Sequence, residues 1–163
     1  MAHGLTIARR PKEALAAARR ALDLDPNSAH GHNVLGFALA CDGKGAEAIE
    51  AIERVMRISP RDPIKAGYYI SAGFANVVAG RYPEAAEWAR RALAELPDLP
   101  NGHFLLAASA AQAGLLDEAR AAMAAARRLQ PRISLARVER SVPLAHAADR
   151  ARYIEGLRLA GLE

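Results

Sequence analysis

The stretch PEAAEWARRALAELP, residues 83–97, contains the spacing that decides the fold. Ala85, Ala89 and Ala92 lie three or four residues apart, and Pro97 follows five residues after the last of them. Residues at this spacing share one side of a helix, and alanine side chains allow a second helix to approach that side closely. Proline lacks the amide hydrogen that would continue a helix. The stretch therefore predicts a helix that packs through its alanines and stops before Pro97.

The same pattern returns along the chain. Pro26, Pro60, Pro97 and Pro131 are separated by 34, 37 and 34 residues. Before each of the last three prolines, a glycine is followed by an alanine, and then by two small or apolar residues, at fixed distances. These positions are Gly43, Ala48, Ile52 and Val55, then Gly80, Ala85, Ala89 and Ala92, then Gly114, Ala119, Met123 and Ala126. Only the second half of the pattern precedes the first proline, at Ala14, Ala18 and Ala21.

A period of about 34 residues, with glycine between two helices and a closing proline, resembles the tetratricopeptide repeat. The resemblance implies an all-α fold: a solenoid of helical hairpins with about three and a half repeats plus C-terminal capping helices. Units of this kind cannot bury their apolar faces alone and share one continuous core. We expect a single domain over residues 1–163, composed of a half repeat 11–26, a repeat 27–60, a lengthened repeat 61–97, a repeat 98–131 and capping helices 132–163.

Composition supports a helical domain and argues against several classes of function. Of the 163 residues, 52% are hydrophobic but only 5% are aromatic, so alanine and leucine must form most of the core. The net charge of +4 is modest and the arginines are scattered in pairs, so we expect no nucleic-acid partner. The single Cys41 excludes an internal disulfide, and no apolar run has the length of a membrane span or a signal peptide. We expect a cytoplasmic protein without a membrane partner.

Two units depart from the pattern. The second full unit is three residues longer, and Asp62 before Pro63 is a typical helix start, so we expect the extra residues to lengthen its first helix at the beginning. The N-terminal unit lacks a first helix, because MAHGLTIARR is too short to supply one. Either the chain derives from a longer one, or another surface covers the unpaired helix.

After Pro131 the repeat fades. Ser134 is placed to cap a short helix ending at Arg140, and a final helix is expected from Asp149 to Ala160. Tyr153, Leu157 and Ala160 share one face of that helix. We expect this tail to cover the last repeat; the alternatives are that it reaches into the groove or pairs between chains.

The family resemblance implies that the first helices of the repeats line a concave groove in which ligands dock. At the corresponding positions there is no lysine or arginine, so we do not expect the groove to grip a carboxylate. An apolar surface with polar margins instead favours an extended peptide or a partner helix. The expected groove residues are His30, Asn33, Phe37, Ile70, Phe74, Val77, Asn101, Phe104 and Gln112.

No pattern predicts catalysis. Cys41 has no evident partner base, and His30 and His32, two residues apart, cannot share one helix face as a metal pair would. There is no glycine-rich phosphate loop. We therefore expect a protein that is not an enzyme and that has no catalytic residues, no cofactor and no metal.

A narrower resemblance rests on three segments: ISPRDP (58–63), AGRYPEAAEWARRALAELP (79–97) and DRARYIEGLRLAGL (149–162). Together they are similar to the C-terminal repeat modules of bacterial class III adenylate/guanylate cyclases and winged-helix regulators. This leaves two hypotheses. The first is a protein-interaction scaffold that binds a peptide or helix in its groove. The alternative is a self-associating regulatory module of a larger signalling enzyme such as a nucleotide cyclase, with a second copy of itself as partner.

Overall fold

Residues 10–163 are the part of the chain that the computed structural model describes, and within them lie nine α-helices and no β-strand. The helices are α2 (Pro11–Leu24), α3 (Ala29–Cys41), α4 (Gly45–Ile58), α5 (Lys65–Val78), α6 (Tyr82–Glu95), α7 (Pro100–Gln112), α8 (Leu116–Leu129), α9 (Leu135–Ser141) and α10 (Ala147–Leu159). This is the predicted all-α solenoid of helical hairpins.

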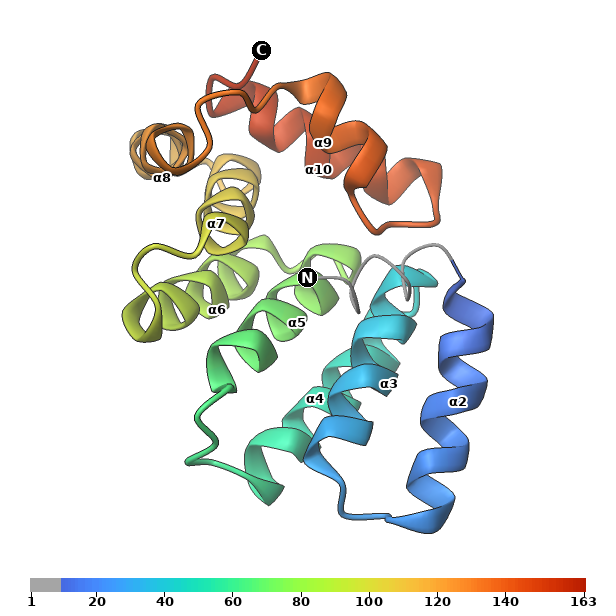
Figure 1. Cartoon of the computed structure of the whole chain (residues 1–163). Helices are drawn as coiled ribbons and strands as arrows, with labels where there is room; N and C mark the ends of the chain where they lie inside the picture. The colour runs from blue at the N-terminus through green and yellow to red at the C-terminus, as the bar shows by residue number, and fades with distance from the viewer. Residues whose placement is uncertain (1–9) are drawn as a thin grey trace.

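The helices form three hairpins, α3 with α4, α5 with α6 and α7 with α8 (Figure 1). Each hairpin packs against the next, and α2 packs on α3 at one end of the stack. The first helices, α3, α5 and α7, also contact one another in sequence. They line the concave side of the stack, on which the candidate site lies.

The small or apolar residues at the repeated positions of the second helices lie in the core. A side chain larger than these would not fit without moving a helix, because the positions are completely or almost completely enclosed. Their exposed fractions are 0–2%: Ala48, Ile52 and Val55 in the first hairpin, Ala85, Ala89 and Ala92 in the second, and Ala119, Met123 and Ala126 in the third. The alanines of the stretch 83–97 thus belong to the scaffold.

Glycine makes the turn inside each hairpin, as predicted. Gly43, Gly80 and Gly114 have φ angles of 79°, 73° and 82°, a left-handed conformation that glycine adopts without steric cost. The amide after each glycine donates back to the helix that has just ended; the Lys44 amide, for example, bonds the Leu39 carbonyl at 2.9 Å. This hydrogen bond closes the first helix and directs the chain into the second.

The lengthened unit differs from the prediction. Helix α5 has 14 residues, only one more than α3 and α7, so the extra residues lie mainly in the connection 59–64 rather than in the helix. Asp62 is not the helix cap. Its carboxylate accepts hydrogen bonds from the Ile64 amide at 3.0 Å and from the Tyr68 hydroxyl at 2.8 Å. Asp62 therefore folds the longer connection back onto the first turns of α5.

Helix α2 has the sequence of a second helix of the repeat; the expectation that MAHGLTIARR supplies no first helix lies outside the described residues, apart from Arg10. Ala21 occupies the repeat position of Val55, Ala92 and Ala126, which are 0% exposed, yet Ala21 is exposed. Leu24, in the same last turn of α2, is 89% exposed. Ala18, at the preceding repeat position, is 3% exposed, so α2 buries part of its repeat face and leaves Ala21 and Leu24 of its last turn exposed.

The C-terminal pair does not continue the stack. Helix α10 packs mainly on α7, with smaller contacts to α8, α9 and α5, and α9 packs on α10 (Figure 1). The link between α9 and α10 reaches the far hairpin, where the Ala145 amide donates to the Cys41 carbonyl at 2.9 Å and His146 Nε2 lies 2.9 Å from the Asp42 carbonyl. The tail covers the last hairpin and also crosses the concave side to α3.

Candidate functional site

A pocket of about 740 Å³ lies on the concave side, between the three first helices and the C-terminal pair. Its walls come from α3, α5 and α7 on one side and from α9, α10 and the segments around them on the other. The first helices contribute His30, Asn33, Val34, Phe37, Gly67, Ile70, Ser71, Phe74, Asn101 and Phe104, together with Ile64 just before α5. The C-terminal part contributes Gln130, Ile133, Arg137, Val138, Ser141, Val142, Pro143 and Tyr153.

Seven of the nine groove residues expected from the sequence line this one pocket. They are His30, Asn33, Phe37, Ile70, Phe74, Asn101 and Phe104. The other two lie elsewhere. Val77 is buried in the apolar cluster that also contains Tyr153 and Leu157, and the side-chain amide of Gln112 donates to the Arg152 carbonyl of α10 at 2.6 Å. Both are therefore part of the packing of the chain itself.

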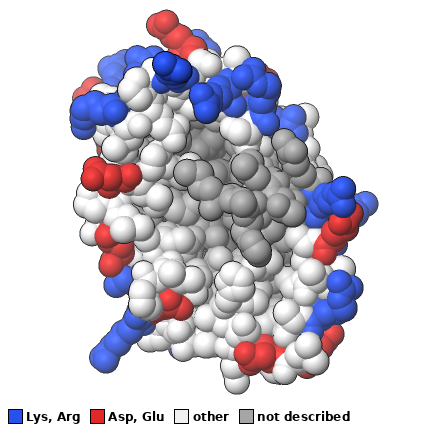
Figure 2. All heavy atoms as spheres, in the orientation of Figure 1, with Lys and Arg blue, Asp and Glu red and all other residues white. Residues whose placement is uncertain are grey.

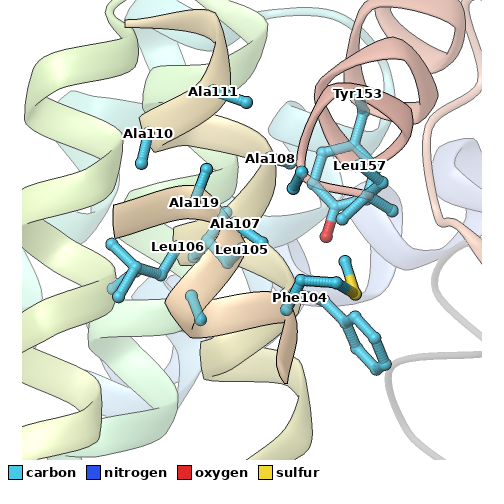
Figure 3. Packing of buried hydrophobic residues seen from close by; sticks show 14 of the residues in the cluster. Phe104, Leu105, Leu106, Ala107, Ala108, Ala110, Ala111, Ala119, Tyr153 and Leu157 are labelled. Carbon is cyan, nitrogen blue, oxygen red and sulfur yellow. The ribbon is translucent and has the colours of Figure 1, made fainter. Parts of the chain in front are cut away.

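Helix α10 docks through one aromatic side chain and one glycine. Tyr153 stacks on Phe74 with ring centroids 5.6 Å apart, and Phe74 meets Phe37 edge to face at 6.1 Å. Figure 3 shows Tyr153 and Leu157 lying beside Ala108 of α7, above Phe104. At Gly156 a β-carbon would come within 2.5 Å of the Ala108 carbonyl oxygen, so only glycine permits this close approach of the two helices.

The aromatic residues of the pocket differ in how accessible they are. Phe74 and Phe104 are only 7% and 6% exposed, because α10 covers them, and they act chiefly as core. Phe37 and Ile70 are half-buried and present apolar surface to the pocket. A β-carbon at Gly67 would meet no atom within 4 Å, so the pocket is open above the start of α5.

Asn33 lines the pocket, and its side-chain amide has an unpaired acceptor. Its amide oxygen is buried, and no group in the described part of the chain donates a hydrogen bond to it. An unpaired buried acceptor costs about 1–3 kcal/mol, which a ligand N–H group can recover. The neighbouring Ser71 is already engaged, because its hydroxyl donates to the Gly67 carbonyl at 3.2 Å.

The lining residues named above include one arginine, Arg137, and no aspartate, glutamate or lysine. Burial raises the pKa of the Tyr153 phenol, so this side chain stays uncharged at ordinary pH. The pocket is thus apolar with a single formal positive charge, and that charge comes from α9.

The sequence did not predict that α9 would contribute to the site. Arg137, Val138 and Ser141 follow no repeat position, so their placement depends on where α10 docks. The available signal was the apolar face of Tyr153, Leu157 and Ala160 in a helix after the last repeat, together with Gly156 on the same side. That face indicates docking but does not identify the surface that receives it.

The reactive residue types serve structural roles. His32 and His103 occupy the same repeat position, and the Nε2 atom of each lies close to the carbonyl six residues earlier, that of Pro26 at 2.9 Å and that of Pro97 at 2.8 Å. Cys41 is buried, and burial raises the pKa of its thiol to about 12, which disfavours the nucleophilic thiolate. Within residues 10–163, no three His, Cys, Asp or Glu side chains are grouped as metal ligands would be.

Comparisons with known proteins agree with this architecture. Residues 8–63 match the family model of the tetratricopeptide repeat. Among solved structures, the chain is similar to MamA (residues 41 to the end) from Desulfovibrio magneticus RS-1, with 19% identity, a TM-score of 0.66, and coverage of 97% of this chain and 94% of that one. It is also similar to YrrB, described as a TPR protein with an unusual peptide-binding site, with 22% identity, a TM-score of 0.62, and coverage of 96% and 79%.

A third similar structure is PilW, described as a widely conserved type IV pilus biogenesis factor, with 20% identity, a TM-score of 0.69, and coverage of 89% of this chain and 63% of that one. No match was found among curated proteins. The fold is thus that of a tetratricopeptide-repeat solenoid, and at these identities the likeness concerns the fold alone. None of these matches is to a cyclase or a winged-helix regulator, so they do not support the narrower resemblance, which remains a hypothesis.

In the part of the chain that the structure describes, no helix has the length and apolar character needed to cross a membrane.

Proposed function

We propose that this protein is a non-catalytic interaction scaffold that binds an extended peptide in the concave pocket. The observation that carries the proposal is the combination, in one pocket, of exposed apolar surface on Phe37 and Ile70 with the unpaired amide oxygen of Asn33. Apolar side chains of a peptide gain free energy by entering such a pocket. A free backbone N–H of the same peptide can donate to the Asn33 amide oxygen once this side chain turns toward the pocket.

An extended peptide fits these features better than a partner helix. A helix uses its backbone N–H groups internally, apart from those of its first turn, so its sides offer no backbone donor to Asn33. A helix is also 10–12 Å wide with its side chains, and α10 with α9 already occupies the far part of the concave side. The space beside them therefore favours a single extended segment.

The test compares two substitutions of an apolar residue by aspartate. Ile70→Asp places a charge in the pocket wall, and Leu24→Asp introduces the same charge on the exposed face of α2. Short random peptides displayed on phage are selected against the wild-type chain, and the selected peptides are synthesised for fluorescence-anisotropy titration. We expect Ile70→Asp to weaken binding at least about tenfold, about 1.4 kcal/mol, and Leu24→Asp to leave it unchanged.

Both variants must keep the wild-type circular dichroism spectrum for this comparison to count. Phe74 is avoided because it is almost fully buried, so an aspartate there would unfold the core. Peptides that bind equally well to wild type and to Ile70→Asp would contradict the proposal.

A second candidate function is self-association through α2. The observation that favours it is the exposure of Ala21, whose repeat equivalents Val55, Ala92 and Ala126 are 0% exposed, in the same turn as Leu24, which is 89% exposed. If two copies pair through this face, light scattering should give a mass that rises toward that of a dimer with concentration, and Ala21→Glu should restore the monomer. A monomeric mass at all concentrations would remove this candidate.

A further inference from the structure

The charge around the concave pocket is one-sided. The charged side chains in Figure 2 lie around the margin of this face, and lysine and arginine concentrate at its upper edge, where Figure 1 places α8 and α9. Arg132, Arg137 and Arg140 come from this segment, and Arg137 extends the positive charge into the pocket itself. A ligand that enters here meets an apolar wall on one side and a cation on the other.

Arg137 differs from two arginines of α10 in having no acidic partner, and among the arginines without one it is the one that lines the pocket. Arg152 pairs with Asp149 and Arg158 pairs with Glu155, both within one turn of α10. For Arg137, in contrast, no carboxylate within residues 10–163 lies within ion-pair distance of the guanidinium. Its planar fork of donors is available to a carboxylate of a partner.

The position of Arg137 is fixed by the helix that carries it. Ser134 caps α9, and its hydroxyl accepts a hydrogen bond from the Arg137 amide at 3.3 Å. Val138, the next residue, is buried against the core, and Ser141, one turn later, lines the same pocket as Arg137. The backbone of Arg137 is therefore held beside the pocket by the capped helix and by buried Val138, and its exposed side chain can reach a ligand there.

We infer that the peptide bound in this pocket carries an aspartate or glutamate close to its apolar anchor, and that Arg137 selects for that carboxylate. The inference rests on the proposed function and adds the chemistry of the partner. Complementary charge gives specificity and speeds association, whereas a like charge at the same place on the peptide disfavours binding. A charged pair on the partly exposed rim is screened by salt, so the preference for acidic peptides weakens as the ionic strength rises.

The experiment is a peptide selection against three forms of the chain. The forms are wild type, Arg137→Glu, and Arg20→Glu, which changes the net charge equally but lies on α2 outside the pocket. Glutamate at position 137 is compatible with α9, because Ser134 and a glutamate three residues later form a capping box. We expect acidic residues beside an apolar residue among the peptides selected by wild type and by Arg20→Glu, and their loss with Arg137→Glu.

A synthetic pair of peptides makes the test quantitative. One selected peptide is compared with its form in which Asp or Glu is replaced by Asn or Gln, on wild type and on Arg137→Gln. We expect the acidic peptide to bind wild type about tenfold more tightly than its amide form, and this preference to fall to about one with Arg137→Gln. A preference that is the same on both proteins overturns the inference.

The remaining outcomes separate the inference from the proposed function. Peptides that depend on Ile70 but show no acidic preference would leave the scaffold function standing and remove the role of Arg137. If no selected peptide depends on Ile70, the proposed function itself fails. Anionic vesicles or single-stranded oligonucleotides that compete with the peptide, and that are blocked equally by Arg137→Glu, would show that the cation recognises anions in general and would overturn the choice of an acidic peptide.

Discussion

The hairpins α3–α8 and the C-terminal pair α9–α10 are packed in different ways. In the hairpins, small or apolar residues are buried at equivalent positions, and a glycine turn with the same hydrogen bond recurs three times. The C-terminal pair docks through features that occur once, namely the stacking of Tyr153 on Phe74 and the close approach at Gly156. The stability of the hairpins is therefore spread over many similar contacts, while that of the C-terminal pair depends on a few residues.

The largest expected effect comes from Tyr153→Ala. Tyr153 is 3% exposed, and truncating a buried aromatic residue costs about 3–5 kcal/mol. Because this free energy belongs to docking of α10, we expect α10 to open while α3–α8 stay folded. Limited trypsin digestion should then cut at Arg150, Arg152 and Arg158, and amide exchange should speed up in α10 but not in α7.

The control for this prediction is Leu159→Ala, which changes α10 at a side chain that is 40% exposed. It should leave the digestion pattern unchanged. If Tyr153→Ala instead lowered the protection of all helices together, the C-terminal pair and the hairpins would form one cooperative unit.

The second effect tests the hairpins at one repeat position in two environments. Ala92 is 0% exposed, and the equivalent Ala21 on α2 is exposed. Ala92→Leu overpacks a fully enclosed position, with an expected cost of about 3 kcal/mol in the free energy of unfolding. Ala21→Leu should change it by less than about 0.5 kcal/mol. Urea denaturation followed by circular dichroism measures both; equal costs would mean that α2 is covered in solution.

A smaller effect separates two glycines that both lie in helices. A β-carbon at Gly156 would meet the Ala108 backbone, whereas one at Gly67 would meet nothing. We expect Gly156→Ala to cost about 1–2 kcal/mol of docking free energy. Gly67→Ala should be neutral or stabilise the chain by up to about 1 kcal/mol, because alanine favours the helix. The same trypsin assay and a thermal unfolding curve report the difference, and a stabilised Gly156→Ala would show that the two helices separate easily.

The sequence predicted the hairpins well because their contacts are periodic. The positions of Ala85, Ala89 and Ala92 are buried in each of the three hairpins. The spacing of these positions alone therefore identifies the core and the glycine turns. The pattern does not extend to the longer connection at 59–64, where Asp62 bonds Ile64 and Tyr68 instead of capping α5. A helix start was expected there because an aspartate before a proline is a good local signal, but the Asp62 carboxylate bonds Ile64 and Tyr68 in the turn that precedes and enters α5.

The candidate site was predictable on one side only. The first helices follow the repeat, so residues such as Phe37, Ile70 and Asn101 could be placed on one face from their numbers. The other wall depends on where α10 docks, and its contacts with Phe74 and Ala108 are long-range and occur once. Arg137 therefore entered the pocket without any sequence signal, and the absence of basic residues from the first helices gave an incomplete picture of the charge.

The smallest expected effect concerns a contact that occurs once inside the periodic part. Glu118 accepts two hydrogen bonds of 2.7 Å from Arg90, which joins α6 of the second hairpin to α8 of the third. These bonds lower the pKa of Glu118, so its contribution to stability is complete above the ordinary value of 4.5 and is lost as the pH falls through the lowered one. Both side chains are about one third exposed, which limits the expected contribution to about 1 kcal/mol or less.

Glu118→Gln should therefore lower the free energy of unfolding slightly at neutral pH and no longer do so in acid. Glu84→Gln, at the same repeat position on the exposed surface, should change nothing at either pH. A loss that is equal for both variants would mean that the glutamates serve their own helices rather than the junction between hairpins.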